Sequence, residues 1–211
     1  MASRTLDQFR PDNTVSPAAR KAAKRRPEWT APTRADLGQG CILAFDPSLG
    51  ATGFVALEHT QGLLRVVDAQ TIKGDAPEMC TGWERVFQQA LTLGAKLRSL
   101  LEPYSRLSWS VVHESPPVGG GKIKSIESTV LAGQSLRFAT ECLGFAMMPM
   151  VSSVQHKYAT VGRSHLDKPT HHQLLKPILE ALALDNLSYI TNEAKRDAIS
   201  VALTELMRRK S

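Results

Sequence analysis

The chain has 211 residues, 42% of them hydrophobic, which suits one sizeable core and is too few for two ordinary domains plus a tail. A formal charge of +6 favours polyanionic partners, although charge alone does not separate nucleic acid from an acidic membrane surface. Apolar runs stay below the roughly 18 residues of a membrane-spanning helix, so no membrane association is expected. Without metal-ligand spacing or a preceding secretory leader, the three cysteines predict reduced thiols in a cytoplasmic protein: Cys41, Cys80 and Cys142.

The first 39 residues differ in composition from the rest. They carry eight basic and four acidic residues, with scattered proline and serine and no sustained hydrophobic period. The basic run 21–26 would repel itself in a packed element, so we expect a mostly disordered arm. It either binds DNA or targets the protein, or it is a solubilising extension without a partner. Residues 40–211 are expected to form the single catalytic domain.

Apolar runs and turn residues then predict alternating strands and helices. The expected strands are 41–45, 53–57, 63–72, 109–113 and 145–151. The expected helices are 82–101, 128–143, a helix that includes 176–184, and 192–209. This order predicts an α/β fold, a mixed five-stranded sheet flanked by helices. Trp83 and Trp109 are expected to pack in the core.

Four carboxylates fall at the ends of these elements. Asp46 ends the first strand, Glu114 ends the fourth, and the last helix opens with Glu193 and Asp197 on one face. Converging carboxylates repel one another unless a hard cation neutralises them, so a cluster here implies Mg²⁺, with Mn²⁺ able to substitute. Two such ions in one site would activate a water for phosphodiester hydrolysis. Singly, each acid also has an ordinary explanation as a turn former, a helix-start residue or a salt-bridge partner.

Two further groups of residues are candidate sites. The glycine-rich loop with Lys122 and Lys124 follows Glu114 and suits contact with a nucleic-acid backbone, although such a loop is also an ordinary exposed connection. His171 and His172 are adjacent, so they should point in different directions on a helix. Together with His165, and with no cysteine or HExxH partner, they do not predict a zinc site.

Several of these motifs occur together and in order. The first strand and turn read as an apolar run, Asp46-Pro, four residues, then Thr-Gly and an aromatic residue, and 111–114 read Val-Val-His-Glu. Further along come Gly133-Gln134 with Arg137, then Lys157, Val161-Gly162 and Lys168, and finally Arg196-Asp197-Ala198. From Cys41 to Leu206, this ordered set resembles the RuvC family of Holliday-junction resolvases, which are RNase H-like nucleases.

The resemblance implies a fold, an activity and a site. The expected fold is RNase H-like, and the expected enzyme is a crossover junction endodeoxyribonuclease that resolves four-way DNA junctions by paired hydrolysis. Two Mg²⁺ ions would be held by Asp46, Glu114, Glu193 and Asp197, and no nucleotide cofactor is implied. Lys168 would stabilise charge on the phosphate, and DNA contacts would include Lys157 and Arg163 with Lys122, Lys124 and Lys168. The working unit would be a homodimer that pairs through the helix at 128–143.

This chain departs from the family pattern at three places. The position three residues before Asp197, commonly an acid or histidine in the family, is Ala194, so the ligand role is assigned to Glu193. Pro116, Pro117 and Val118 stand where the family places an aromatic residue, so sequence-selective cutting is expected to differ. The loop 162–168 is longer than expected, which leaves open which basic side chain approaches the phosphate.

Other functions fit parts of the same pattern. Residues 46–53 also resemble the phosphate-binding hairpin of actin-like ATPases, but the duplicated second domain and the adenosine motif of those proteins are missing. A metal-free DNA-binding or scaffolding protein could use this fold. So could a related nuclease acting on flaps, nicked forks or RNA–DNA hybrids.

Overall fold

The computed structural model describes residues 29–116, 123–146 and 149–210. Contacts divide the chain after residue 30, and residues 31–211 form one unit. Most of the predicted basic arm lies outside the described residues, but residues 31–39 belong to the unit. Leu37 is buried, and the Arg34 guanidinium donates to the carbonyl oxygens of Leu182 at 2.6 Å and Gly62 at 3.0 Å. The folded unit therefore begins before the boundary predicted at residue 40.

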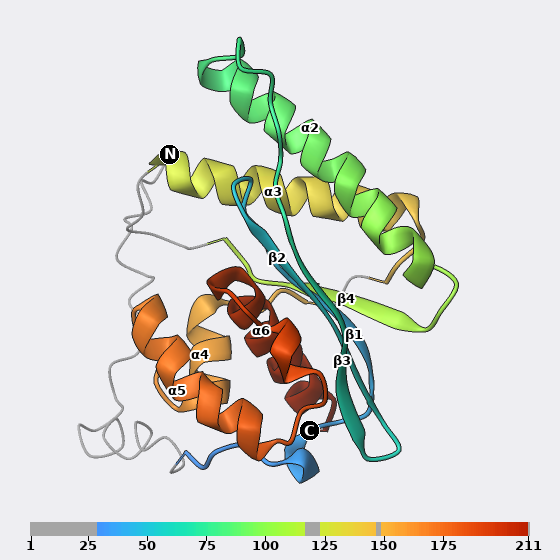
Figure 1. Cartoon of the computed structure of the whole chain (residues 1–211), viewed down its shortest axis with the longest axis vertical. Coiled ribbons are helices and arrows are strands. Elements are labelled where there is room, and N and C mark those ends of the chain that lie inside the picture. The colour runs from blue at the N-terminus through green and yellow to red at the C-terminus, as the bar shows by residue number, and fades with distance from the viewer. Residues whose placement is uncertain (1–28, 117–122, 147–148, 211) are drawn as a thin grey trace, which may run out of the picture. The chain divides into compact units, whose positions relative to one another are not determined.

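A four-stranded mixed sheet is the centre of the unit (Figure 1). Its strands are β1 (Gly40–Asp46), β2 (Thr52–Thr60), β3 (Leu63–Ile72) and β4 (Trp109–His113). The order is β3-β2-β1-β4, antiparallel except for the parallel pair β1–β4. The hairpin between β2 and β3 turns on Gln61 and Gly62, both at positive φ, as expected of a two-residue loop that matches strand twist.

Helices cover both faces of this sheet (Figure 1). The helices are α2 (Gly82–Leu101), α3 (Ile123–Cys142), α4 (Ser153–Val161), α5 (Lys168–Ala181) and α6 (Glu193–Lys210), with short 3₁₀ turns η2 (Arg34–Asp36), η3 (Glu102–Tyr104) and η4 (Leu187–Tyr189). Leu43 and Phe45 of β1 pack with α2 and α3 in one core cluster. By the two-residue period of a strand, Ile42 and Ala44 point to the opposite face, where α6 lies against β1 and β2. Helices α4 and α5 contact α6 in turn, which is why nearly all of its middle is buried.

The predicted fifth strand is not confirmed: the described residues, which leave out 147–148, form a sheet of four strands. The described residues at both ends of segment 145–151 bond to β4. Val111 donates to the Ala146 carbonyl, and Val151 donates to the carbonyl of His113. Pro149 lacks the N–H that a continuous ladder needs, and among the described residues an isolated bridge joins Glu114 and Val151.

The predicted helices 82–101 and 192–209 agree with α2 and α6, whereas α3 begins at Ile123, five residues before the predicted 128. Helix α4 was not predicted; it begins with a capping box between Ser152 and Gln155 and ends at Gly162 in the left-handed region. Helix α5 spans Lys168–Ala181 after its N-cap Asp167, so it contains 176–181 of the predicted 176–184 and ends before the rest. No helix in the described ranges is long and apolar enough to cross a membrane.

Candidate active site

Strand geometry brings Asp46 and Glu114 side by side. Asp46 follows Ile42 and Ala44 on the face of β1 that α6 covers, and Glu114 follows Val112 with the same parity. The Glu114 backbone N–H donates to the Phe45 carbonyl at 2.9 Å, which continues the parallel ladder to the site. Two carboxylates thus end neighbouring parallel strands on one face of the sheet.

Helix α6 adds a third carboxylate from above that face. Asp197, one turn into the helix, is 1% exposed. The first turn can come this close because residue 53, paired with Asp46 across β1 and β2, is glycine. A Cβ on Gly53 would overlap the backbone carbonyl of Ala194. The Thr-Gly pair after the first strand therefore has a physical role: it allows α6 to place Asp197 at the strand ends.

The Lys168 ammonium lies among these carboxylates. It stands at the start of α5, with Nζ 2.8 Å from Asp197 Oδ2 and 3.7 Å from Asp46 Oδ2. Its side chain is 53% exposed, while that of Asp197 is 2% exposed. The acids are therefore held by the fold, whereas the lysine can turn toward solvent or toward a bound anion.

The charges at this site shift the pKa values of its members. Burial, and after it the neighbouring Glu114, raise the pKa of Asp46 to about 7. Burial also acts to raise the pKa of Asp197, but His171, His172 and the Lys168 ammonium outweigh it and hold that pKa well below its usual range. Burial acts to lower the pKa of Lys168, and Asp46 and Asp197 raise it overall. At neutral pH Asp197 and Lys168 are charged, and Asp46 is near its titration midpoint.

A stability prediction follows from Asp46. The pKa of Asp46 is about 7 in the folded protein and 3.8 in the unfolded chain, so the folded state binds this proton more tightly. The resulting stabilisation is complete below pH 3.8 and is lost as the pH rises through 7. We expect Asp46→Asn, which is always neutral, to melt about 4 °C higher than wild type at pH 8 in EDTA. The difference should shrink toward pH 5. Thermal melts across this range test it, with the exposed Asp75→Asn as control, and an Asp46→Asn variant that melts lower at pH 8 would contradict it.

The donor set fits a hard divalent cation. Asp46, Glu114 and Asp197 supply carboxylate oxygens from three different elements, and the ammonium of Lys168 already contacts two of them. Asp197 Oδ2 is buried and is paired with the half-exposed Lys168 ammonium, which can leave it for a bound anion. Clustered carboxylate oxygens are the ligands that Mg²⁺ and Mn²⁺ take in proteins. These three residues could therefore hold divalent metal.

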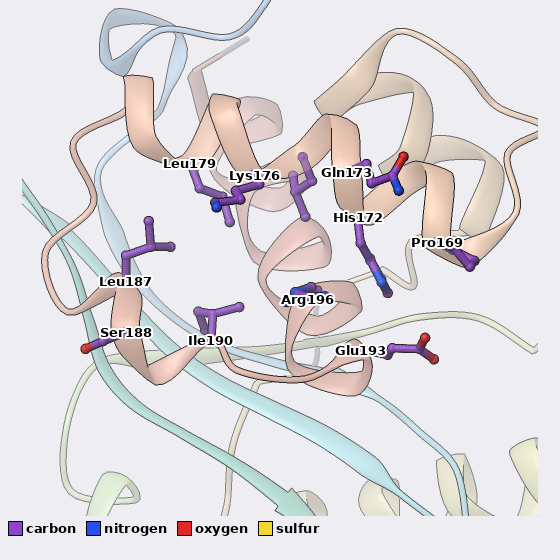
Figure 2. Close-up of a pocket in the computed structure, with 11 residues that line it drawn as sticks. Pro169, His172, Gln173, Lys176, Leu179, Leu187, Ser188, Ile190, Glu193 and Arg196 are labelled. Atoms are coloured by element: carbon purple, nitrogen blue, oxygen red, sulfur yellow. The ribbon is translucent and has the colours of Figure 1, made fainter.

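Glu193, the fourth predicted ligand, lies elsewhere. It is exposed and lines a cavity of about 620 Å³ between α5, η4 and α6, together with His172 and Arg196. Figure 2 shows the Glu193 carboxylate pointing away from the other labelled side chains. Within the described part of the chain, that carboxylate forms neither an ion pair nor a hydrogen bond. The structure therefore brings together three of the four predicted acids.

The other predicted basic residues are spread around the site. Lys157 Nζ donates to the Leu166 carbonyl at 2.8 Å, so it ties down the loop that precedes Lys168. Arg163, in that same loop, is exposed. Lys122 and the side chain of Lys124 lie outside the described residues.

Sequence reasoning considered the histidines of α5 but did not predict that they approach Asp197. His171 and His172 are both buried, and both rings approach Asp197, at 3.6 Å and 3.0 Å from Oδ1. Side chains of adjacent residues on a helix diverge, but the Asp197 carboxylate lies between the two imidazoles and both can reach it. The signal was present in the sequence as two histidines on a helix that begins at Lys168.

Solved structures of low sequence identity share this fold. Thermus thermophilus RuvC in complex with a Holliday junction substrate aligns with a TM-score of 0.61 at 17% identity, over 80% of this chain and 94% of that chain. A further structure of Thermus thermophilus RuvC gives a TM-score of 0.58 at 17% identity, with the same shares covered. The yeast mitochondrial Holliday junction resolvase gives 0.53 at 7% identity, over 82% of both chains. Neither a family model nor a curated protein sequence matches the chain. The chain therefore has a RuvC-like fold.

Proposed function

We propose that this protein is a metal-dependent endonuclease that resolves four-way DNA junctions. The observation that carries the proposal is the convergence of Asp46, Glu114 and Asp197 at the ends of β1 and β4 and the start of α6, with Lys168 among them. A fold shared with two Holliday junction resolvases supports the choice of substrate. The formal charge of +6 suits a polyanion.

The residues divide the work of phosphodiester hydrolysis. Divalent ions held by the carboxylates would lower the pKa of a bound water and neutralise charge on the phosphate. Asp197 is ionised at neutral pH and is kept in place by its burial and by the bond from His172. Asp46 must lose its proton before it can bind a cation fully. Lys168 can turn from Asp197 to a phosphate oxygen and offset the negative charge that develops there.

A substrate panel tests this function. Wild-type protein is incubated in Mg²⁺, and separately in Mn²⁺, with a four-way junction, a flap, a nicked fork, a linear duplex and an RNA–DNA hybrid. The proposal predicts that the four-way junction is cut fastest. Preferential cutting of a flap, fork or hybrid would assign a related nuclease. Tight junction binding without cutting in either metal would assign a DNA-binding role and overturn the proposal.

We also propose that the working unit is a homodimer. A four-way junction is approximately two-fold symmetric, and one site per chain cannot reach both strands at once, so two chains match the substrate. The surface that supports this is wider than the predicted helix 128–143. On α3, Leu136 and Ala139 turn to the core while Phe138 remains 67% exposed. On α2, which packs against α3, exposed apolar side chains recur every four residues: Trp83, Phe87 and Leu91.

A charge placed on the exposed apolar surface of α2 and α3 should weaken the dimer. Phe138→Glu would desolvate a carboxylate at the interface, so we expect the dimer dissociation constant to rise at least about tenfold. Sedimentation at micromolar concentration measures it. Leu107→Glu is the matched control, because Leu107 is 58% exposed but lies in the loop before β4. A wild-type monomer that still makes paired, symmetric cuts would contradict the dimer.

A further inference from the structure

Three histidine side chains gather around Asp197 and Glu114. His172 Nε2 forms a 3.0 Å hydrogen bond with Asp197 Oδ1, and His171 Nδ1 lies 3.6 Å from the same oxygen. His156 Nε2, from α4, lies 3.4 Å from Glu114 Oε2. All three rings are buried, with His172 the most exposed at 5%. Asp197 and Glu114 of the carboxylate cluster are therefore each in contact with a buried imidazole.

The hydrogen bonding of this cluster is incomplete. Across the described residues, the buried imidazole nitrogens without a hydrogen bond are His171 Nδ1 and His156 Nε2, which face carboxylate oxygens at 3.6 Å and 3.4 Å. Asp197 Oδ2 is paired with Lys168 Nζ at 2.8 Å. Buried polar atoms are nearly always satisfied, so an unbonded His171 Nδ1 facing Asp197 indicates a place for a ligand. One ligand atom each from His171, His172 and Asp197 lie within 4.8 Å of one another. One cation can bridge atoms at that spacing.

Hydroxyl groups lie beside the other nitrogen of two of these imidazole rings. His171 Nε2 lies 3.5 Å from Thr160 Oγ1, and His156 Nδ1 lies 3.0 Å from Ser200 Oγ. With its Nε2 near a hydroxyl, His171 presents Nδ1 toward Asp197. Such partners fix the orientation and tautomer of metal-binding histidines.

Helix α6 offers the cation few donors of its own. Ala194, one turn before Asp197 on the same face, has no donor atom. Glu193 shares the cavity of Figure 2 with His172, but it is not among the described side chains whose ligand atoms lie within 4.8 Å of one another. Asp197 is therefore the carboxylate that α6 contributes, and the nearest additional donors are the imidazoles of α5.

We propose that His172, together with His171, ligates the divalent ion held by Asp197, so that the centre is a mixed imidazole and carboxylate site. Ligation through His172 Nε2 would replace its hydrogen bond to Asp197 Oδ1, with the ring proton carried on Nδ1. The inference rests on the metal dependence of the proposed function and names the ion class. Imidazole nitrogen suits transition-metal ions, whereas Mg²⁺ prefers oxygen alone. The site therefore binds Mn²⁺ more tightly than Mg²⁺, and Co²⁺ and Zn²⁺ also fit it.

Metal binding to the full-length, metal-free protein tests this without DNA. Calorimetric titration with Mn²⁺ and with Mg²⁺ should show Mn²⁺ bound at least about tenfold more tightly. His172→Ala should weaken Mn²⁺ binding about 10- to 100-fold and Mg²⁺ binding much less. Pulsed electron paramagnetic resonance of bound Mn²⁺ should show nitrogen coupling in wild type that decreases in the variant. His165→Ala, an exposed histidine in the preceding loop, is the control and should change neither quantity.

A second variant separates ligation from positioning. His172→Gln keeps a hydrogen-bond donor for Asp197 but has no imidazole lone pair, so it should lose Mn²⁺ affinity as His172→Ala does. It also serves as the test if His172→Ala fails to fold. Full Mn²⁺ affinity in His172→Gln, or wild-type protein without nitrogen coupling, would overturn the inference.

The two proposals fail in distinguishable ways. A chain that binds Mn²⁺ through His172 but cuts no DNA would refute the nuclease and leave the mixed site standing. A metal-dependent nuclease whose Mn²⁺ binding does not depend on His172 would refute the mixed site alone.

Discussion

Replacing Asp46, Glu114 or Asp197 singly with the corresponding amide is expected to slow cleavage by on the order of 10³-fold. Each amide keeps the shape of the side chain but removes the negative charge that binds a cation. The three acids lie on separate elements, so none can take the place of another. Binding to a four-way junction in Ca²⁺ should change less than about threefold, because most affinity comes from contacts with phosphates.

Two further variants sharpen this test. Glu193→Gln should retain cleavage within about tenfold of wild type, because the Glu193 carboxylate lies at the neighbouring cavity and takes no part in the carboxylate cluster. Asp75→Asn, which removes a surface partner of Lys96, should cut at the wild-type rate. Cleavage at the wild-type rate by any one of the three cluster variants would show that its carboxylate is not needed.

Gly53→Ala is expected to destabilise the protein by about 3 kcal/mol and to reduce cleavage to background. The added methyl would overlap the Ala194 carbonyl, a backbone group that cannot turn aside. The first turn of α6 must then move away from β2, and Asp197 moves with it. Urea unfolding measures the stability, and single-turnover cleavage measures the displacement of the site.

Gly50→Ala is the matched control, because Gly50 lies in the adjoining turn and a Cβ there would meet no atom within 4 Å. It should unfold within about 0.5 kcal/mol of wild type. If Gly53→Ala were equally benign, the close approach of α6 to β2 would not be what positions Asp197.

The sheet was largely predictable, because its strands combine apolar runs with clear ends. Residues 63–72 and 109–113 match β3 and β4 in full. The predicted strand 145–151 has an apolar composition, but composition does not reveal which backbone groups find partners, and Pro149 breaks the ladder. Helix α4 has only 9 residues and a weak hydrophobic period, so its capping box was its main signal.

The carboxylate cluster was predictable for a related reason. Asp46 and Glu114 follow strand positions whose parity fixes their face, and Asp197 belongs to the face of α6 that meets the sheet. Glu193 shares that face by helical period, but it is the first residue of the helix and the cavity lies beside it. The helical period predicts which way a side chain points but not which element packs against it. The packing of α5 against α6, which brings His171 and His172 to Asp197, is a tertiary contact that the period does not encode.

The exposed face of α2 also shows that a hydrophobic period does not predict which element covers a given face. Trp83 was expected in the core and is 64% exposed, while Trp109 packs against the core cluster and edge-on to Tyr104. Both residues lie in apolar patterns of similar strength. The wide apolar stripe of α2 exceeds what the sheet and α3 cover, and the sequence pattern does not show which part of it faces outward.

Strand-resolved cleavage of a four-way junction tests the central claim most directly. Each of the four strands is labelled in turn, and wild-type protein is incubated with Mg²⁺, with Mn²⁺ and with EDTA. The account predicts paired cuts at symmetric positions in two opposed strands, present with either metal, absent in EDTA and absent for Asp46→Asn under all conditions. Cuts that persist in EDTA, or equal cutting by Asp46→Asn, would contradict it.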